Sequence, residues 1–154
     1  MNINKSVKNG VIVYSQAEKP RACRLELSHQ VDLINLIRFN FPQHSKLMFH
    51  PTNEGKHTAF HRSRQIKEGM LAGVSDIICL SRGANHSAFI CELKQPKLTY
   101  SSVNTDQRLF LEGCHGEGLF SCVAFGAAAG WRAWCDYIGV TDHEIIKKAD
   151  HIAK

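Results

Sequence analysis

Asp76, Glu92 and Lys94 are ionisable residues at the ends of two neighbouring apolar runs. Asp76 begins one run, directly after the turn Gly73-Val74-Ser75, and Glu92 and Lys94 end the next run along the chain. Side chains at positions i and i+2 of a strand project from the same face, so Glu92 and Lys94 point the same way. If the two runs pair as a hairpin, Asp76 lies beside them at its open end. The three side chains could then share one site.

Two carboxylates brought together repel each other, and a divalent cation between them removes that repulsion. Carboxylate and backbone carbonyl oxygens suit Mg²⁺ or Mn²⁺. A cation held in this way polarises a phosphodiester and activates bound water, while Lys94 orients or activates that water. The alternative is a structural ion-pair cluster at the end of a sheet, because an Asp followed later by Glu-x-Lys occurs by chance in many proteins.

Hydrophobic periodicity indicates the elements that must position these residues. Apolar side chains recur at helical spacing over 25–39, 58–71, 104–114 and 126–138. Short apolar runs bounded by turn residues predict strands over 47–50, 76–80, 88–94 and 119–125. This alternation predicts an α/β fold with helices on a central sheet. Trp131, Trp134 and Tyr137 form a stripe on the helix over 126–138 that is typical of a core or a subunit interface.

The composition is that of an ordinary globular domain with a basic excess. The chain has 154 residues, of which 44% are hydrophobic and 21% charged, so we expect one domain. Nineteen Lys and Arg against fourteen Asp and Glu give a net charge of +5. This balance excludes the class of acidic, disordered tail proteins and makes a polyanionic partner such as nucleic acid worth testing.

Other classes of protein are disfavoured. No apolar stretch is long enough for a membrane span, and the first residues do not have the pattern of a signal peptide. We interpret the cysteines as reduced thiols of a cytoplasmic protein, because no CxxC pair occurs and nothing indicates export. The six cysteines are Cys23, Cys79, Cys91, Cys114, Cys122 and Cys135.

A cluster of basic residues precedes the turn before Asp76. It is either a solvated helix face or a surface that contacts the phosphate backbone of DNA, and its position favours DNA. Lys46, Lys97 and Arg108 could extend this surface. The cluster consists of Lys56, His57, His61, Arg62, Arg64 and Lys67.

Histidines do not indicate a zinc site. His57 and His61 have the i, i+4 spacing of a zinc pair, but residue 58 is Thr58 and no third ligand is evident. We interpret His50, which ends a predicted strand, as a packing or hydrogen-bonding residue.

The order of these features resembles the VRR-NUC (virus-type replication-repair nuclease) domain of the PD-(D/E)xK phosphodiesterase superfamily, in its phage-type stand-alone form. The resemblance extends from about Arg24 to Ile138. Ser75 stands where the family usually has proline, which we expect to loosen the turn. The matching features, in chain order, are Glu26 on an early helix, the loop His50-Pro51-Thr52-Asn53, the basic helix, Gly73-Val74-Ser75-Asp76, Glu92-Leu93-Lys94 and Gln107 on a later helix.

The resemblance implies a restriction-endonuclease-like core, with a central mixed β-sheet flanked by helices. It would place the nuclease domain at 23–140. From the residues themselves, we expect an N-terminal arm or short strand at 1–22, with one short apolar run at 11–14, and a helical tail at 141–154. Asp76, Glu92 and the Leu93 carbonyl would bind Mg²⁺ or Mn²⁺. Lys94 would be catalytic, and Glu26 and Gln107 would support the site.

The resemblance also implies a substrate and an assembly. Phage-type members are largely homodimers, and some cleave branched DNA such as four-way (Holliday) junctions during replication and repair. The expected location is the cytoplasm, that of the host cell if a phage encodes the protein. The alternatives are a nickase or flap nuclease with the same chemistry, a metal-dependent RNase, or a non-catalytic nucleic-acid-binding protein.

Overall fold

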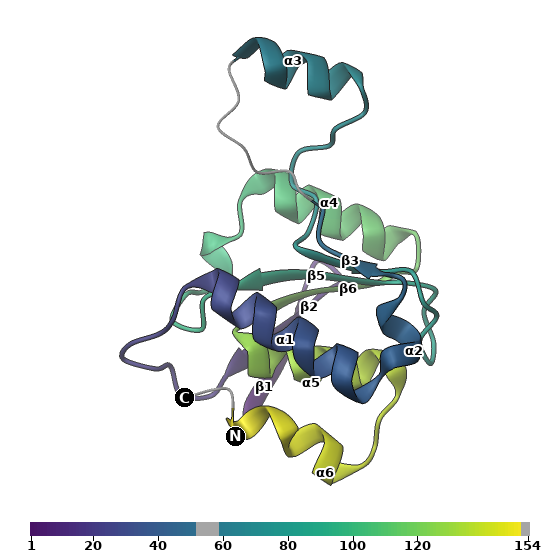
Figure 1. The fold of residues 1–154 in the computed structure, drawn as a ribbon. Coiled ribbons are helices and arrows are strands. Elements are labelled where there is room, and N and C mark those ends of the chain that lie inside the picture. The colour runs from purple at the N-terminus through teal and green to yellow at the C-terminus, as the bar shows by residue number, and fades with distance from the viewer. Residues whose placement is uncertain (52–58, 152–154) are drawn as a thin grey trace.

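A six-stranded sheet in the order β1-β2-β6-β5-β4-β3 forms the centre of the computed structural model of the protein (Figure 1). The structure describes residues 1–51 and 59–151, and of residues 59–62 only the backbone. β2, β6 and β5 run parallel, whereas the other strand pairs are antiparallel. The predicted α/β fold with a mixed sheet is therefore confirmed. The strands are β1 (Ile3–Lys8), β2 (Val11–Gln16), β3 (Met48–Phe49), β4 (Ile77–Cys79), β5 (Phe89–Lys94) and β6 (Phe120–Phe125).

Helices cover both faces of the sheet. α1 (Glu26–Asn40) and α5 (Ala127–Ile138) pack on one face, and α4 (Thr105–Gly116) covers the other (Figure 1). α3 (Ala59–Lys67) projects away from the rest of the molecule. The short helices are α2 (Pro42–Ser45), α6 (His143–Ile146) and the 3-10 helices η1 (Tyr100–Ser102) and η2 (Lys147–His151).

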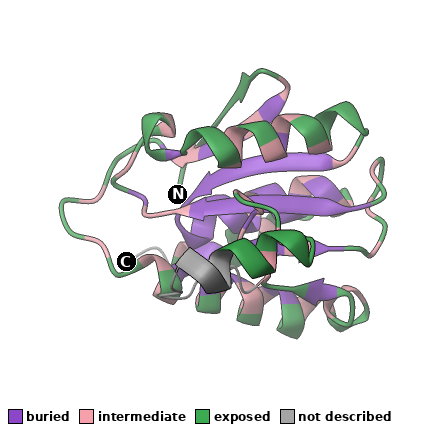
Figure 2. Ribbon diagram, turned by 90° about the horizontal axis from the view of Figure 1, so that it is seen from above, coloured by how far each residue is buried: buried purple, intermediate pink, exposed green. Residues whose placement is uncertain are grey.

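The central strands are apolar throughout because both of their faces are covered. Every residue of β6 is buried, as are the residues of β5 up to Leu93. Parallel strands covered on both faces read as continuous hydrophobic runs for this reason. Trp131, Trp134 and Tyr137 are buried in the core between the sheet and α5, so the aromatic stripe belongs to the core. Figure 2 shows the buried ribbon following the strands.

The N-terminal region differs most from the expectation. Two paired strands, β1 and β2, occupy the region expected as an arm or short strand. β2 is largely buried, but β1 is exposed at every residue except the partly buried Ile3. β1 therefore lacks the alternation of apolar and polar residues by which a strand is recognised in a sequence. It is identified as a strand by its pairing with β2. The domain boundaries expected at 22 and 140 stay predictions.

The cysteines are all free, as the sequence predicts. Burial raises the pKa of the Cys135 thiol to about 12, and burial also raises the pKa values of Cys79 and Cys114. Buried thiols of this kind act as small apolar side chains. In the described part of the chain, no helix is both long enough and apolar enough to cross a membrane.

Candidate active site

The hairpin of β4 and β5 places Asp76 beside Glu92. Ile77 pairs with Cys91 in antiparallel register, so Asp76, one residue earlier, comes opposite Glu92. Asp76 Oδ2 accepts a hydrogen bond of 2.8 Å from the backbone N–H of Leu93. This bond fixes one oxygen of the carboxylate against β5, at the open end of the hairpin.

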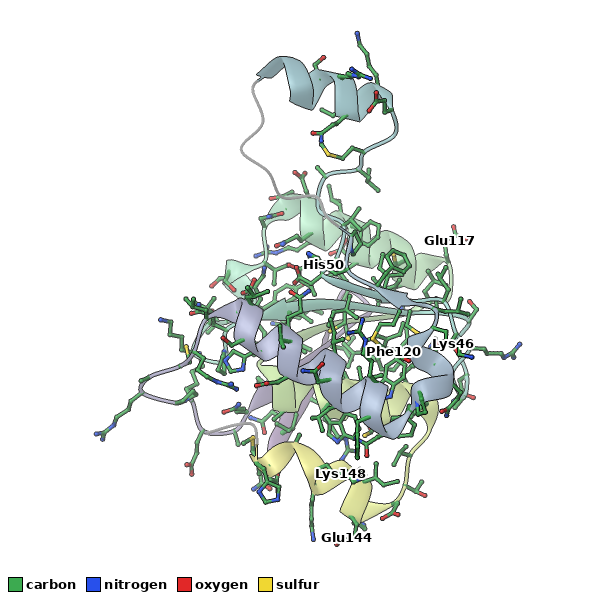
Figure 3. All side chains as sticks on the ribbon, in the orientation of Figure 1. Lys46, His50, Glu117, Phe120, Glu144 and Lys148 are labelled. Atoms are coloured by element: carbon green, nitrogen blue, oxygen red, sulfur yellow. The ribbon has the colours of Figure 1, made fainter. Side chains whose placement is uncertain are left out.

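His50 holds the backbone of Asp76 from the neighbouring strand. β3 pairs with β4, and His50, directly after β3, has its Nδ1 atom 2.6 Å from the Asp76 carbonyl oxygen. A carbonyl oxygen can only accept, so Nδ1 must carry the proton and donate it. His50 is thus a hydrogen-bonding residue at the base of the segment that leads to α3 (Figure 3).

Glu92 is a fully buried carboxylate at the centre of the site. Its Oε1 atom accepts hydrogen bonds from Lys94 Nζ at 2.7 Å and from Gln107 Nε2. Its Oε2 atom has no hydrogen-bond partner within the described residues. Burial raises the pKa of Glu92 to about 7, and the charge of Asp76 adds to the rise while Lys94 opposes it. Glu92 is therefore a buried acid whose negative charge is only partly offset by Lys94.

Lys94 lies between two carboxylates. Its Nζ atom is 2.7 Å from Glu92 Oε1 and 4.0 Å from Glu26 Oε1, at the start of α1. Burial alone would lower the pKa of Lys94, but the charges of Glu92, Glu26 and Asp76 raise it above its usual value. In this arrangement Lys94 is a protonated hydrogen-bond donor.

Gln107 reaches Glu92 because the N-terminus of α4 is capped. The Asn104 side chain accepts from Gln107 N at 2.9 Å, and Gln107 Oε1 accepts from Asn104 N at 3.0 Å. This reciprocal pair is a capping box. It fixes the Gln107 side chain, whose Nε2 group donates to Glu92.

Gly73 brings the turn before Asp76 against the same end of α4. Its φ is +76°, and a Cβ atom added there would come 2.3 Å from the backbone carbon of Asp106. Only glycine fits both the left-handed conformation and this approach. Ser75 in the same turn is fully buried, and among the described residues its hydroxyl has no hydrogen-bond partner. The turn packs closely against α4, and the loosening expected from the absence of proline stays a prediction.

The structure thus gathers Asp76, Glu92, Lys94, Glu26 and Gln107 at one edge of the sheet, with Leu93 between two of them. They come from the turn directly before β4, from strand β5 and from the first turns of helices α1 and α4.

The basic cluster lies only partly within the described residues. Arg64 and Lys67 lie on α3, and Arg64 Nε is 2.7 Å from Glu68 Oε1. His61 and Arg62 also lie on α3, but only their backbone is described. Lys56 and His57 lie outside the described residues.

Two of the three residues expected to extend the basic surface have other positions or contacts. Lys46 precedes β3, and β3 runs antiparallel to β4, so Lys46 lies at the opposite end of the hairpin from Asp76. Arg108 donates to the Tyr100 carbonyl at 3.3 Å and lies over the Tyr100 ring. Lys97 is exposed three residues after Lys94.

The segment between β2 and α1 also lies next to the site, which the residue pattern did not predict. Cys23 Sγ donates to Gln95 Oε1 at 3.7 Å, directly after Lys94. Lys19 and Arg21 lie in this segment. Their position just before the Glu26 helix is the signal that could have revealed it.

The donor set fits a hard divalent cation. Asp76 and Glu92 supply carboxylate oxygens, and the buried Glu92 Oε2 lacks a partner among the described residues. A cation there would offset the repulsion that raises the pKa of Glu92. Within the described residues, no three His, Cys, Asp or Glu side chains come together as a metal cluster. Mg²⁺ does not need such a cluster, because it keeps several waters and uses one or two carboxylates.

A comparison with solved structures finds a VRR-NUC domain protein that aligns with a TM-score of 0.66 at 18% sequence identity. The alignment covers 79% of this chain and 93% of that protein. This chain has the VRR-NUC fold. No family model and no curated protein matches the sequence. The predicted VRR-NUC fold, with its mixed sheet flanked by helices, is therefore confirmed by tertiary structure.

Proposed function

We propose that the protein is a Mg²⁺- or Mn²⁺-dependent DNA endonuclease that hydrolyses phosphodiester bonds. The observation that carries this proposal is the buried Glu92 carboxylate, which has one unpartnered oxygen among the described residues and lies beside Asp76 and Lys94. A buried carboxylate oxygen without a partner is unfavourable in a structural ion-pair cluster, whereas a bound cation would satisfy it. The VRR-NUC fold supports the same assignment.

Asp76, Glu92 and the Leu93 carbonyl would hold the ion. When bound, the ion would supply Lewis-acid activation of the attacking water and of the phosphate. The Leu93 N–H keeps one Asp76 oxygen turned toward β5. Gln107 and Lys94 orient Glu92 by donating to its Oε1 atom, which leaves Oε2 available as a ligand.

Lys94 would orient the attacking water and offset the charge that develops on the phosphate. An ammonium group has donors and no lone pair, and the neighbouring acids keep Lys94 protonated. Orientation is therefore preferred over proton abstraction as its role. Glu26, 4.0 Å from Lys94 Nζ, would hold that ammonium in place.

The substrate we propose is branched or otherwise non-linear DNA, with the four-way junction as the leading candidate. The net charge of +5 suits a polyanion, and the projecting α3 carries exposed Arg64 and Lys67 to contact backbone phosphates. A homodimer would place two active sites on two symmetric strands. The role in replication and repair, the phage source and the cytoplasmic location stay predictions.

A cleavage panel with an isosteric variant tests the proposal. Linear, nicked, flap and four-way DNA, and RNA of the same sequence, are incubated with Mg²⁺ or Mn²⁺ and the parent protein or Asp76→Asn. We expect the parent to cleave DNA and Asp76→Asn to lose at least 100-fold in rate, about 3 kcal/mol of transition-state stabilisation. Glu117→Gln, an exposed carboxylate at the far end of α4, is the matched control and should cleave as the parent does. Equal cleavage by Asp76→Asn and the parent would refute the site.

A further inference from the structure

The segment between β2 and α1 crosses the edge of the sheet that carries the candidate active site. It starts after Gln16, at the end of β2, and β2 runs parallel to β6. The end of β6 is in register with Lys94, because Phe125 pairs with it. Further along, Cys23 donates to Gln95. Figure 1 shows this segment looping out on the side of the molecule where β5 ends. We call residues 17–27, which are this segment and the first two residues of α1, the rim segment.

The rim segment offers free positive charge. Lys19 and Arg21 are exposed, and within the described residues neither forms an ion pair. Arg24, by contrast, is held by Asp32 at 2.6 Å, and this pair anchors the segment to α1. Two exposed cations in a segment that contacts the chain directly after Lys94 are suited to contact phosphates next to the candidate active site.

The rim segment also exposes two aliphatic side chains, one on each side of Glu26 in the chain. Leu25 is 72% exposed and Leu27 is 67% exposed. They flank Glu26, whose carboxylate lies 4.0 Å from Lys94 Nζ. A single exposed leucine needs no explanation. A pair on either side of a site residue, preceded by free cations, has the composition of a surface that contacts both the backbone and the bases of DNA.

We propose that the rim segment binds DNA next to the cleaved bond and selects substrates with unpaired bases there. Lys19 and Arg21 contact backbone phosphates, and Leu25 and Leu27 pack against the apolar faces of bases. In an intact duplex those faces are stacked inside, whereas at a branch point or in a single strand they are open to an apolar side chain. This inference rests on the proposed nuclease function and adds to it a physical basis for preferring non-linear DNA.

The leucines are tested by a ratio of rates. The ratio of cleavage of a flap or four-way substrate to cleavage of a linear duplex is measured for the parent and for Leu25→Ser/Leu27→Ser. We expect the ratio to fall about tenfold, the scale expected when one or two leucines lose buried apolar contact. The matched control is Leu47→Ser/Leu80→Ser. These leucines are 51% and 57% exposed at the opposite end of the β3–β4 pair, and the control should keep the parent ratio.

The cations are tested by binding. The affinity of the cleavage-deficient Asp76→Asn protein for a flap substrate is measured at several salt concentrations, with and without Lys19→Ala/Arg21→Ala. We expect the dissociation constant to rise about tenfold near 0.1 M salt and the slope of log K against log salt to fall by about two, since each phosphate contact contributes about one. The control Lys8→Ala/Arg82→Ala removes one Lys and one Arg from the end of the sheet opposite Lys94 and should change neither quantity.

The results separate this inference from the proposed function. If the parent cleaves DNA but the rim variants keep its ratio and its salt slope, the rim inference is wrong and the nuclease assignment stands. If the parent neither binds nor cleaves any DNA, the rim inference and the nuclease assignment are both wrong. Circular dichroism and thermal unfolding show whether each variant folds. If the serine variant does not fold, Leu25→Ala/Leu27→Ala is measured in its place, and we expect the same tenfold fall in the cleavage ratio.

Discussion

At the scale of single residues, the site combines a buried acid with the groups that hold it. Glu92 has one oxygen bound by Lys94 and Gln107 and one oxygen without a partner among the described residues. Without a bound cation this arrangement lowers the stability of the folded protein, because burial and the charge of Asp76 both disfavour the charged form of Glu92. Residues placed for function commonly cost stability in this way.

Glu92→Gln should therefore change how stability depends on pH. The pKa of Glu92 is about 7 in the folded protein, raised from 4.5, so the folded state binds more protons between pH 4.5 and 7. The free energy of unfolding contributed by Glu92 is thus highest below pH 4.5 and falls as pH rises through 7. In EDTA, the stability of Glu92→Gln relative to the parent should rise by about 2–3 kcal/mol from pH 5 to pH 8.

Urea unfolding at both pH values measures this difference. Glu117→Gln, which replaces an exposed acid, should show no such change. Millimolar Mg²⁺ should stabilise the parent at pH 8 and leave Glu92→Gln unaffected, since only a protein that binds the ion gains stability from it. A parallel pH dependence for Glu92→Gln and the parent would contradict the assigned charge state.

At the scale of elements, the site depends on how the turn before Asp76 meets α4. Gly73 packs against the first turn of α4, and the capping box of that helix aims Gln107 at Glu92. The same contact thus positions the turn before Asp76, a proposed metal ligand, and Gln107, which donates to Glu92.

Gly73→Ala should lower both stability and activity. A Cβ atom would come within 2.3 Å of Asp106 backbone at a φ of +76°, so the turn and α4 must separate. We expect a loss of about 1–3 kcal/mol in the free energy of unfolding and a fall in cleavage rate of more than tenfold as Gln107 shifts.

Gly113→Ala is the matched control for this prediction. Gly113 lies on the same helix with no atom within 4 Å of its added Cβ, so alanine there should stabilise α4 by about 0.5–1 kcal/mol without loss of cleavage. Unchanged cleavage by Gly73→Ala would show that the turn does not position the site.

At the scale of the whole molecule, Asp136 joins the N-terminal strands to the core. Its carboxylate accepts from Lys5 of β1, Tyr14 of β2 and Arg132 of α5, each at 2.9 Å. Burial would raise the pKa of Asp136, but the hydrogen bonds from Lys5 and Tyr14, with the charge of Arg132, lower it below its usual value. β2 is the strand that leads into the rim segment, so this junction also anchors that surface.

Asp136→Asn should destabilise the protein at neutral pH and have little effect in strong acid. A carboxyl group with a lowered pKa contributes stability above its unfolded pKa, and that contribution is lost as pH falls through the folded pKa. We expect a loss of about 1–3 kcal/mol at pH 7 that becomes small below about pH 3. Thermal or urea unfolding across this range measures it.

Glu144→Gln serves as the comparison for Asp136→Asn. The Glu144 side chain is 84% exposed, against 16% for Asp136, so its removal should cost at most about 0.5 kcal/mol. A constant loss for Asp136→Asn from pH 3 to pH 7 would mean that its charge does not hold β1 and β2.

Much of the site was predictable because its residues occupy regular positions. The alternation of strands places Glu92 and Lys94 on one face, and the hairpin follows from two short apolar runs joined by a turn. Gln107 and Glu26 came from the resemblance alone, since a glutamine or glutamate in the first turn of a helix has no distinctive pattern. β1 could not be predicted, because an exposed edge strand bears no apolar signature.

The α/β class, the apolar central strands and the order of the ionisable residues can all be read from the amino-acid chain, because continuous apolar runs and the spacing of side chains are local properties. The folded chain adds three facts. Glu92 is fully buried with one oxygen unsatisfied among the described residues, Gly73 packs against α4, and the rim segment contacts the residue after Lys94. These facts depend on contacts between segments far apart in the chain, such as Cys23 with Gln95 and Glu92 with Gln107. No local pattern of residues encodes such contacts.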